Sequence, residues 1–290
     1  MSRSLIFRVL AAAAILLVGV LVRPGTAEQP TSARETFGSK TAAARYGWRP
    51  AVFDFGWEYG EALTDAPKRG TRRVGQWIDV TNGSGSAAQH NGGVLLQSKY
   101  GKRVPQDVGI GDVGTTSIQL TGNAQTYGRW EVRVRPWTTE NNAKDYRVKV
   151  ELVPADPAQY QCGARAITVA DLTPRRNEVR IGAYTPSRNR MWRITRSTTK
   201  LMSTSHAFAV EVTKEHISWF VDGAIVGTLL AKAAIPKVPL TLKVSLVGDG
   251  QSEMNTTYVM MDWLRAYTLK RGTRPANGGK LARGAHNLHC

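Results

Sequence analysis

The sequence has 290 residues, of which 39 are Lys or Arg and 22 are Asp or Glu, and its formal net charge at pH 7 is +17. A chain of this length can bury a full hydrophobic core, and its two cysteines exclude a small domain built on disulfides. The positive charge favours polyanionic partners, with plain solubility as the alternative interpretation.

Residues 1–27 have the pattern of a secretory signal peptide. Two early arginines precede an apolar or small stretch at 9–22, and Gly25 and Ala27 place small residues where a signal peptidase cuts. The apolar stretch is shorter than the roughly 20 residues that span a bilayer. We therefore expect a secreted or cell-envelope protein with no stable membrane span after cleavage. A retained N-terminal anchor is the alternative.

Export changes the expected partner of the positive charge. In a cytoplasmic chain, the charge would point first to nucleic acid. An exported chain instead meets anionic envelope polymers, phospholipid headgroups and acidic polysaccharides, so we expect no nucleic acid partner. The sequence does not define an oligomeric state.

The chain after the signal divides into three parts. Residues 28–45 are polar and unpatterned, which predicts a flexible lead-in. Residues 46–267 alternate apolar and polar side chains in short runs separated by turn signals such as Asp222-Gly223. This pattern predicts an all-β domain of two packed antiparallel sheets. Residues 268–290 form a basic, Gly-rich tail that we expect to be a loosely held extension.

Three stretches resemble glycoside hydrolase family 16, in the family's order. They are Tyr-Gly-Arg-Trp-Glu-Val-Arg at 127–133, the segment 206–223 that ends in Asp-Gly, and Met-Asp-Trp-Leu-Arg-Ala-Tyr at 261–267. The resemblance covers about residues 46–267. It implies a β-jelly-roll sandwich of the concanavalin A-like type, and a polysaccharide of the β-glucan class as substrate.

The family's catalytic motif, Glu-x-Asp-x-x-Glu, corresponds to residues 166–171 of this sequence. Ala166 then stands at the nucleophile position and Thr168 at the helper position, and only Asp171 keeps an acid. Retaining glycosidases need two carboxyl groups about 5–5.5 Å apart, one to attack and one to transfer the proton. A change of register does not restore the site, because in a regular strand Ala166, Thr168 and Ala170 share one face. The standard reaction is therefore not expected.

The period of two also predicts which side chains face the substrate cleft. One set of apolar positions should point into the core: Val148, Val150, Ile167, Val169, Val179 and Ile181. Their neighbours then line the cleft as ligand-binding candidates, together with Trp192: Arg147, Lys149, Glu151, Thr168, Glu178 and Arg180. Such a cleft is charged and net basic, which favours an anionic polysaccharide.

Two groups in this region have alternative interpretations. Glu151 and Glu178 would form an inverting pair of carboxylates if they flanked the emptied strand, whereas ion pairing with neighbouring Lys and Arg is the structural alternative. Trp48, Trp57 and Trp192 would stack on sugar rings if exposed, although core packing is the commoner fate of tryptophan.

The remaining chemistry-bearing residues give few further signals. The histidines of the expected domain lack metal-ligand spacing, and no phosphate-binding loop or nucleophile elbow occurs, so neither a metal nor a cofactor is expected. Cys162 and Cys290 give one hypothetical disulfide, which would tie the basic tail to the rim of the cleft.

Three functions remain open at this stage. The first is an exported, non-catalytic protein that binds a cell-envelope or anionic polysaccharide in the former substrate cleft. The second is an active glycoside hydrolase or transglycosylase in which Asp171 donates the proton. The third is an envelope scaffold held to anionic polymers through its basic surface and tail. Fold resemblance alone does not choose among them.

The signal pattern predicts cleavage after Ala27. N-terminal sequencing of the exported protein should begin at Glu28, because Gly25 and Ala27 supply the small side chains that the peptidase requires. Recovery of a membrane-bound species that still carries residues 9–22 would contradict this prediction.

Overall fold

A computed structural model of the chain describes residues 40–49, 51–56, 76–82, 85–90, 92–98, 115–138, 144–160, 163–186, 190–198, 200–249, 254–269 and 278–285. Several sequence predictions lie outside the described residues: the signal at 1–27, Trp57, and both cysteines of the hypothetical disulfide, Cys162 and Cys290.

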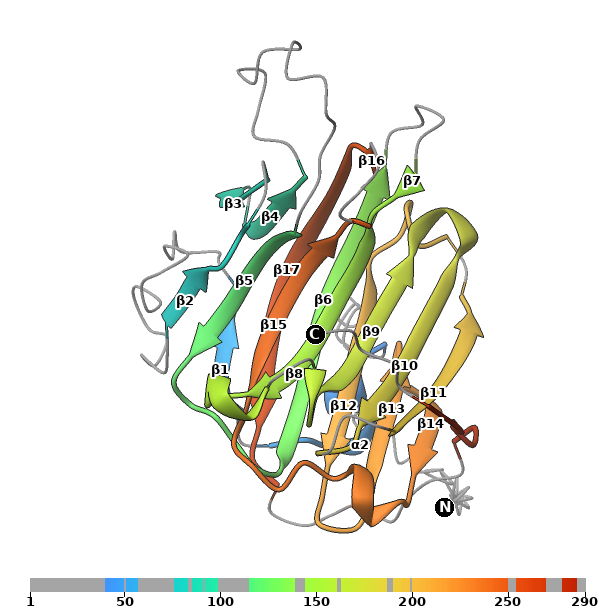
Figure 1. Cartoon of the computed structure of the whole chain (residues 1–290). Coiled ribbons are helices and arrows are strands. Elements are labelled where there is room, and N and C mark those ends of the chain that lie inside the picture. Colours follow the sequence, from blue (N-terminus) through green and yellow to red (C-terminus); the bar gives the residue numbers. More distant parts are fainter. Residues whose placement is uncertain are drawn as a thin grey trace, which may run out of the picture.

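Two eight-stranded sheets pack face to face and form the sandwich (Figure 1). In what we call the back sheet, the strand order is β14-β13-β12-β6-β17-β4-β3, with β1 also paired to β17. The strands of the back sheet are β1 (Ala51–Phe55), β3 (Ser86–His90), β4 (Gly93–Gln97), β6 (Gly128–Thr138), β12 (His206–Val212), β13 (Ile217–Val221), β14 (Ala224–Leu229) and β17 (Thr257–Tyr267).

The front sheet has the order β18-β11-β10-β9-β8-β15-β5-β2, and its pairings are antiparallel. Its strands are β2 (Gln76–Asp79), β5 (Thr115–Thr121), β8 (Arg147–Pro154), β9 (Ile167–Thr173), β10 (Glu178–Tyr184), β11 (Arg190–Ser197), β15 (Leu240–Val247) and β18 (Ala282–Ala285). The remaining elements are a parallel pair, β7 (Lys144–Asp145) and β16 (Met254–Asn255), the helix α2 (Ala42–Tyr46), and the 3-10 turns η1 (Pro157–Gln159), η3 (Pro174–Arg176) and η4 (Lys232–Ala234).

The core lies between the inner faces of the two sheets. Period-two alternation places one set of side chains from each strand there, as expected for sheets with one buried face. Trp77, Trp130 and Trp219 are its largest fully buried side chains. The positions predicted to point inward from the front sheet are all buried members of this core: Val148, Val150, Ile167, Val169, Val179 and Ile181. The predicted two-sheet antiparallel sandwich is therefore confirmed.

The stretches that carry the family resemblance form the central strands of the back sheet. Residues 128–133 open β6, and residues 261–267 close β17, which pairs with β6. The segment 206–223 forms the hairpin β12–β13, and Asp222 and Gly223 then turn the chain into β14 with positive φ angles of 48° and 73°. Positive φ at both central residues is the requirement of a tight hairpin turn that Asp-Gly meets at low steric cost.

Part of the basic tail adds a strand to the front sheet. β18 pairs with β11, so that Arg283 lies opposite Trp192. Just before it, Lys280 bridges to Thr228 of β14 in the back sheet. A Cβ on Gly278 would lie 2.6 Å from the carbonyl carbon of Gly227. Glycine at position 278 therefore lets the backbone pass close to β14. Residues 278–285 thus join one edge of the front sheet to one edge of the back sheet, although the tail pattern predicted only a loose extension.

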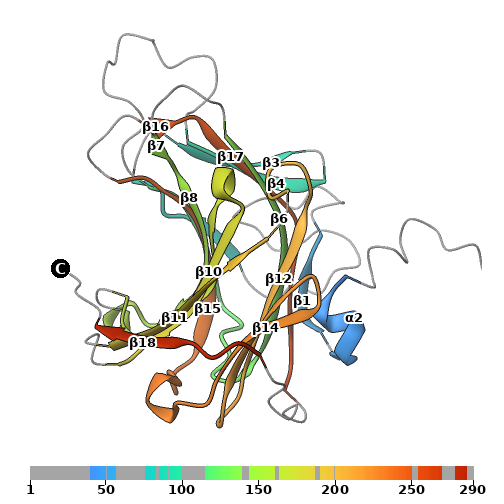
Figure 2. The ribbon, with the colours of Figure 1, turned by 90° about the vertical axis from the view of Figure 1, so that its right-hand side faces the viewer.

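Residues 41–48, which include α2, lie against part of the outer face of the back sheet (Figure 2). Thr41 caps the first turn of α2, and both Ala42 and Ala43 donate their backbone N–H groups to the buried carboxylate of Glu131 on β6. Trp48 then packs edge-on against Phe220. This ordered helix falls within the predicted lead-in. Among the described residues, no helix has the length and apolar character to cross a membrane.

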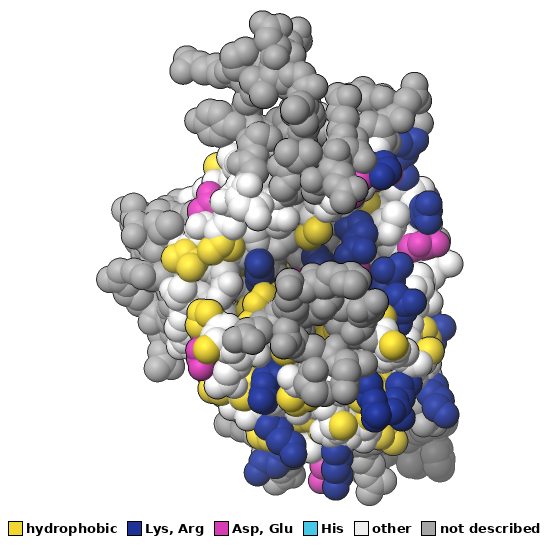
Figure 3. Space-filling model, viewed as in Figure 1, with side chains coloured by type: hydrophobic (Ala, Val, Ile, Leu, Met, Phe, Trp, Pro, Cys, Tyr) yellow, Lys and Arg dark blue, Asp and Glu magenta, His cyan; other side chains and the backbone are white. Residues whose placement is uncertain are grey.

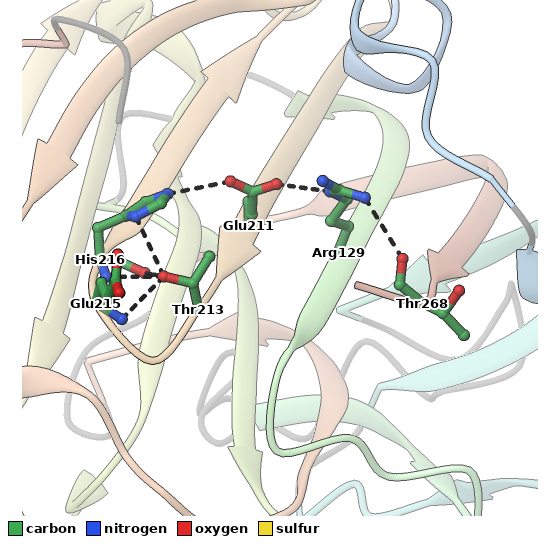
Figure 4. Close-up of polar contacts among 6 residues, drawn as sticks. All are labelled: Arg129, Glu211, Thr213, Glu215, His216 and Thr268. Carbon is green, nitrogen blue, oxygen red and sulfur yellow. Dashed lines mark hydrogen bonds and ion pairs between the residues drawn. The ribbon is translucent and has the colours of Figure 1, made fainter. Parts of the chain in front are cut away.

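A buried polar cluster fixes the ends of several back-sheet strands (Figure 4). Glu211 accepts from Arg129 at 2.6 Å and lies 3.1 Å from Nε2 of His216. Thr213 closes the β12–β13 turn by accepting from the backbone N–H of His216. Arg129 also donates to the carbonyl of Thr268 and stacks over Trp48. Since Glu211 is fully buried, its contacts with Arg129 and His216 offset its loss of water.

The contact between Glu131 and α2 predicts a pH-dependent stability. Burial raises the pKa of Glu131 from 4.5 to about 7, and the two backbone N–H groups only partly oppose this shift. A raised carboxyl pKa stabilises the fold fully below pH 4.5, and this contribution is lost as pH rises through 7. The loss amounts to about 3 kcal/mol.

Glu131→Gln, which stays neutral, should therefore reduce the difference in unfolding free energy between pH 5 and pH 8. Urea titration at the two pH values measures this difference. The exposed Glu215→Gln is the matched control and should keep the wild-type dependence. An unchanged pH dependence in Glu131→Gln would contradict the account.

Candidate functional site

The sequence-predicted site lies on the outer face of the front sheet, where β8, β9 and β10 run side by side. Asp171 is opposite Lys149 on one side and Arg180 on the other. Thr168 is opposite Glu151 and Gly182 in the same way. β9 is thus flanked by β8 and β10, the strands that carry most of the predicted cleft residues.

A β-bulge in β9 decides which side chains reach this face. Glu151 and Val150 are consecutive on β8, yet they pair with Thr168 and Ala170. The same extra residue appears against β10, where Arg180 and Gly182 pair with Asp171 and Thr168. An extra residue reverses the alternation beyond it. Asp171 therefore lies on the same face as Thr168. In a regular strand, Ala170 would share that face with Thr168, and Asp171 would point to the opposite side.

The nucleophile position is closed as well as uncharged. Ala166 has no exposed surface, and its carbonyl accepts from the backbone N–H of Tyr184. Continuing the register of β8 and β9 by one residue brings it opposite Val153, which is also buried. Apolar side chains therefore occupy the place where the family carries its attacking carboxylate.

Asp171 is held between two guanidinium groups. Its Oδ2 lies 3.1 Å from Nη2 of Arg147 and 3.9 Å from Nη1 of Arg180. Burial raises the pKa of Asp171 above its ordinary value of 3.8, while Arg147, Lys149 and Arg180 oppose the shift. Its second oxygen, Oδ1, is buried without a hydrogen-bond partner among the described residues. One oxygen of this carboxylate is thus paired with guanidinium groups, and the other is buried without a partner among the described residues.

Glu151 and Glu178 do not form an inverting pair. Glu151 is ion-paired with Lys149 at 2.7 Å, and this pairing outweighs burial and raises the pKa of Lys149. Glu178 pairs with Thr173, four residues along β10 from Gly182, which lies in the row of Glu151. That offset and two strand spacings separate them by roughly 16 Å, beyond the about 6.5–9.5 Å of an inverting pair. The predicted juxtaposition of the two acids is wrong because they occupy different rows.

A cavity of about 190 Å³ opens beside Asp171. On the face that contains it, Lys and Arg side chains predominate over Asp and Glu among the described residues (Figure 3). The lining includes the predicted Arg147, Thr168, Asp171, Arg180 and Trp192, and also Gly182, Tyr184, Met191 and Arg193. The cavity is therefore polar and basic, although Lys149, Glu151 and Glu178 of the predicted set are not among its lining residues.

The tryptophans take a smaller part than the sequence suggests. Trp192 lines the cavity, but only 9% of it is exposed because it packs into the core, which leaves little ring surface for a sugar. Trp48 lies against the outer face of the back sheet, away from the cavity, so it is not a platform for this site.

Sequence reasoning missed several lining residues for identifiable reasons. Gly182 and Tyr184 follow Arg180 at intervals of two, and extending the alternation would have found them. Met191 and Arg193 enter through the pairing of β10 with β11, where they lie opposite Tyr184 and Gly182. The sequence carries no signal for that register. Among the described residues, no cluster of three or more His, Cys, Asp or Glu side chains offers a metal site.

The sequence model of the family described as Glycosyl hydrolases family 16 matches residues 172–265, beginning directly after the altered motif. Solved structures of that family have the same fold. The laminarinase from Rhodothermus marinus superposes with a TM-score of 0.56 at 15% identity, over 76% of this chain and 97% of its own. The chain is a family 16-like jelly roll.

Two further structures extend the likeness of this family 16-like protein. SCLam, a non-specific endo-β-1,3(4)-glucanase from family GH16, gives a TM-score of 0.54 at 14% identity over 77% of this chain and 91% of its own. A GlcNAcα1-4Gal-releasing endo-β-galactosidase from Clostridium perfringens gives a TM-score of 0.54 at 12% identity, over 79% of this chain and 64% of its own. At sequence identities of 12–15%, these similarities show a shared fold and nothing more. A comparison with curated proteins finds no match.

The closed nucleophile position predicts that an acid placed there destabilises the fold. Ala166→Glu should lower the unfolding free energy by about 3–5 kcal/mol, because the new carboxylate would be buried without a partner. Thr195→Glu, on the exposed part of β11, is the matched control and should change it by no more than about 0.5 kcal/mol. Denaturant titration measures both. Equal stability of the two variants would show that the position is open to water.

Proposed function

We propose that this family 16-like protein binds an anionic polysaccharide on the outer face of its front sheet without hydrolysing it. The proposal rests on two features seen together: Ala166 is buried at the nucleophile position, and Asp171 is held between two arginines. The protein would act after export, in the secreted or cell-envelope setting expected from residues 1–27.

The absence of turnover follows from the chemistry of retaining glycosidases. Ala166 has no atom that can attack an anomeric carbon, and Thr168 carries no charge with which to tune a neighbouring acid. Glu151 is the nearest other carboxylate on this face by register, and Lys149 neutralises it at 2.7 Å. Within the part of the chain that the structure describes, no second carboxylate is therefore free on this face to act with Asp171.

The preference for an anionic polymer follows from the charge of the same face. Arg147, Arg180 and Arg193 line the cavity, against the single carboxylate of Asp171. Guanidinium groups recognise carboxylates and phosphates through charge-assisted hydrogen bonds, which neutral hydroxyl groups match only in part.

Hydrolysis is the competing function, and one observation favours it. Burial raises the pKa of Asp171, as it does for the proton donors of glycosidases. A proton donor alone does not complete either mechanism, because both require a second carboxylate to attack or to activate water.

Incubation of residues 28–290 with a panel of neutral β-glucans and acidic polysaccharides tests the proposal. We expect retention on acidic polymers, weaker retention at higher salt, and no release of reducing ends from any polymer. Release of reducing ends that disappears in Asp171→Asn would overturn the proposal in favour of the hydrolase.

A paired substitution separates cleft binding from diffuse attraction. Arg147→Gln with Arg180→Gln should remove most of the affinity, since both side chains line the cavity. The control double variant, Arg135→Gln with Arg176→Gln, removes the same charge from exposed positions on β6 and η3. Equal losses in the two double variants would show that net charge alone attracts the polymer.

A further inference from the structure

The cavity beside Asp171 has the dimensions of a single sugar ring. Its volume of about 190 Å³ is below the roughly 300–1,000 Å³ of sites that enclose drug-sized ligands. Gly182 forms part of its lining, and a Cβ there would lie 2.4 Å from the carbonyl oxygen of Trp192. A side chain at this position would collide with the backbone of β11, so the close approach of β10 and β11 at the cavity requires glycine.

Two buried polar atoms at this cavity have no hydrogen-bond partner among the described residues: Oδ1 of Asp171 and Nε of Arg147. Only 6% of Asp171 is exposed. Buried polar groups are almost always paired, so unpaired ones call for a partner from outside the protein. One atom is an acceptor and the other a donor. A ligand that satisfies both must present a hydroxyl group and an acceptor oxygen together.

The charge around the cavity selects an acidic ligand. Arg147 and Arg180 share Asp171, and Arg193 is exposed and forms no ion pair within the part of the chain that the structure describes. Lys149 and Glu151 neutralise each other. Three guanidinium groups against one carboxylate leave a positive surplus of two charges, which favours a ligand with a negative substituent over a neutral one.

We infer that this cavity binds one hexuronate unit of the polysaccharide, an inference that rests on the proposed function. Asp171 accepts a hydrogen bond from a ring hydroxyl through Oδ1, and Arg193 with Arg180 holds the ring's carboxylate. In a hexuronate the carboxylate is bonded directly to the ring, so an acidic group and a hydroxyl enter this small cavity together. Asp171, the acid kept from the catalytic motif, thereby serves as a binding residue that orients the sugar.

This role gives Asp171 a distinctive substitution pattern. If the cavity only attracted anions, removal of a negative charge in Asp171→Ala would strengthen uronate binding. If Asp171 accepts a hydroxyl, the same change should weaken binding about tenfold, at the lower end of what a hydrogen bond to a charged group contributes. Asp171→Asn keeps an acceptor oxygen and should retain affinity within about threefold.

Isothermal titration with a tetragalacturonate, a sulfated tetrasaccharide and a neutral β-glucan tetrasaccharide tests the inference. We expect the tetragalacturonate to bind most tightly, and Arg193→Gln to weaken it at least tenfold. Arg193 is exposed, so its loss should leave the thermal unfolding midpoint unchanged. Arg135→Gln, on the other sheet, is the matched control and should bind like the wild type.

Each outcome distinguishes the inference from the proposed function. Tighter tetragalacturonate binding in Asp171→Ala, or equal losses in Arg193→Gln and Arg135→Gln, would overturn the hexuronate assignment. Tightest binding of the sulfated tetrasaccharide would also overturn it and would leave the proposed function intact, whereas tightest binding of the neutral tetrasaccharide would reject the anionic preference of the proposed function as well. Cleavage of any tetrasaccharide would instead reject the proposed function itself.

Discussion

The extra residue in β9 is the constraint on which the site depends. Without the bulge, Asp171 would point into the core between the sheets, where an ionised carboxylate is strongly disfavoured. With it, Asp171 joins Thr168 on the outer face and meets Arg147 and Arg180 at 3.1 and 3.9 Å. Bulges commonly redirect a side chain beside a functional site. Of the three positions that the family resemblance aligns with catalytic acids, Asp171 alone is acidic in this sequence.

The residue at the nucleophile position and the basic residues around Asp171 together define the chemistry of this face. In this chain Ala166 is buried and carries no carboxylate. Arg147 on β8 and Arg180 on β10 flank Asp171, and together with Lys149 they lower its pKa in opposition to burial, which raises it. The proposed role of Asp171 in binding rests on this geometry, in which one oxygen is paired with guanidinium groups and the other has no partner among the described residues.

The sequence predicts much of the fold because alternation is a local property. The inward set on β8, β9 and β10 follows from period two, and Asp-Gly at 222–223 marks a turn that the structure contains. Bulges and pairings depend on contacts between distant segments, which explains why the sequence alone suggested a regular β9 and left the relative positions of Glu151 and Glu178 open. The same limit applies to β18 and to the docking of α2 on Glu131, since each is fixed by a strand far away in the sequence.

A crystal structure of the protein with a tetragalacturonate would show whether the cavity beside Asp171 binds one hexuronate ring without cleavage. We expect an intact chain with one ring in the cavity, a hydroxyl within hydrogen-bond distance of Oδ1 of Asp171, and a carboxylate against Arg193. A cleaved chain, or an intact one bound away from the outer face of the front sheet, would contradict it.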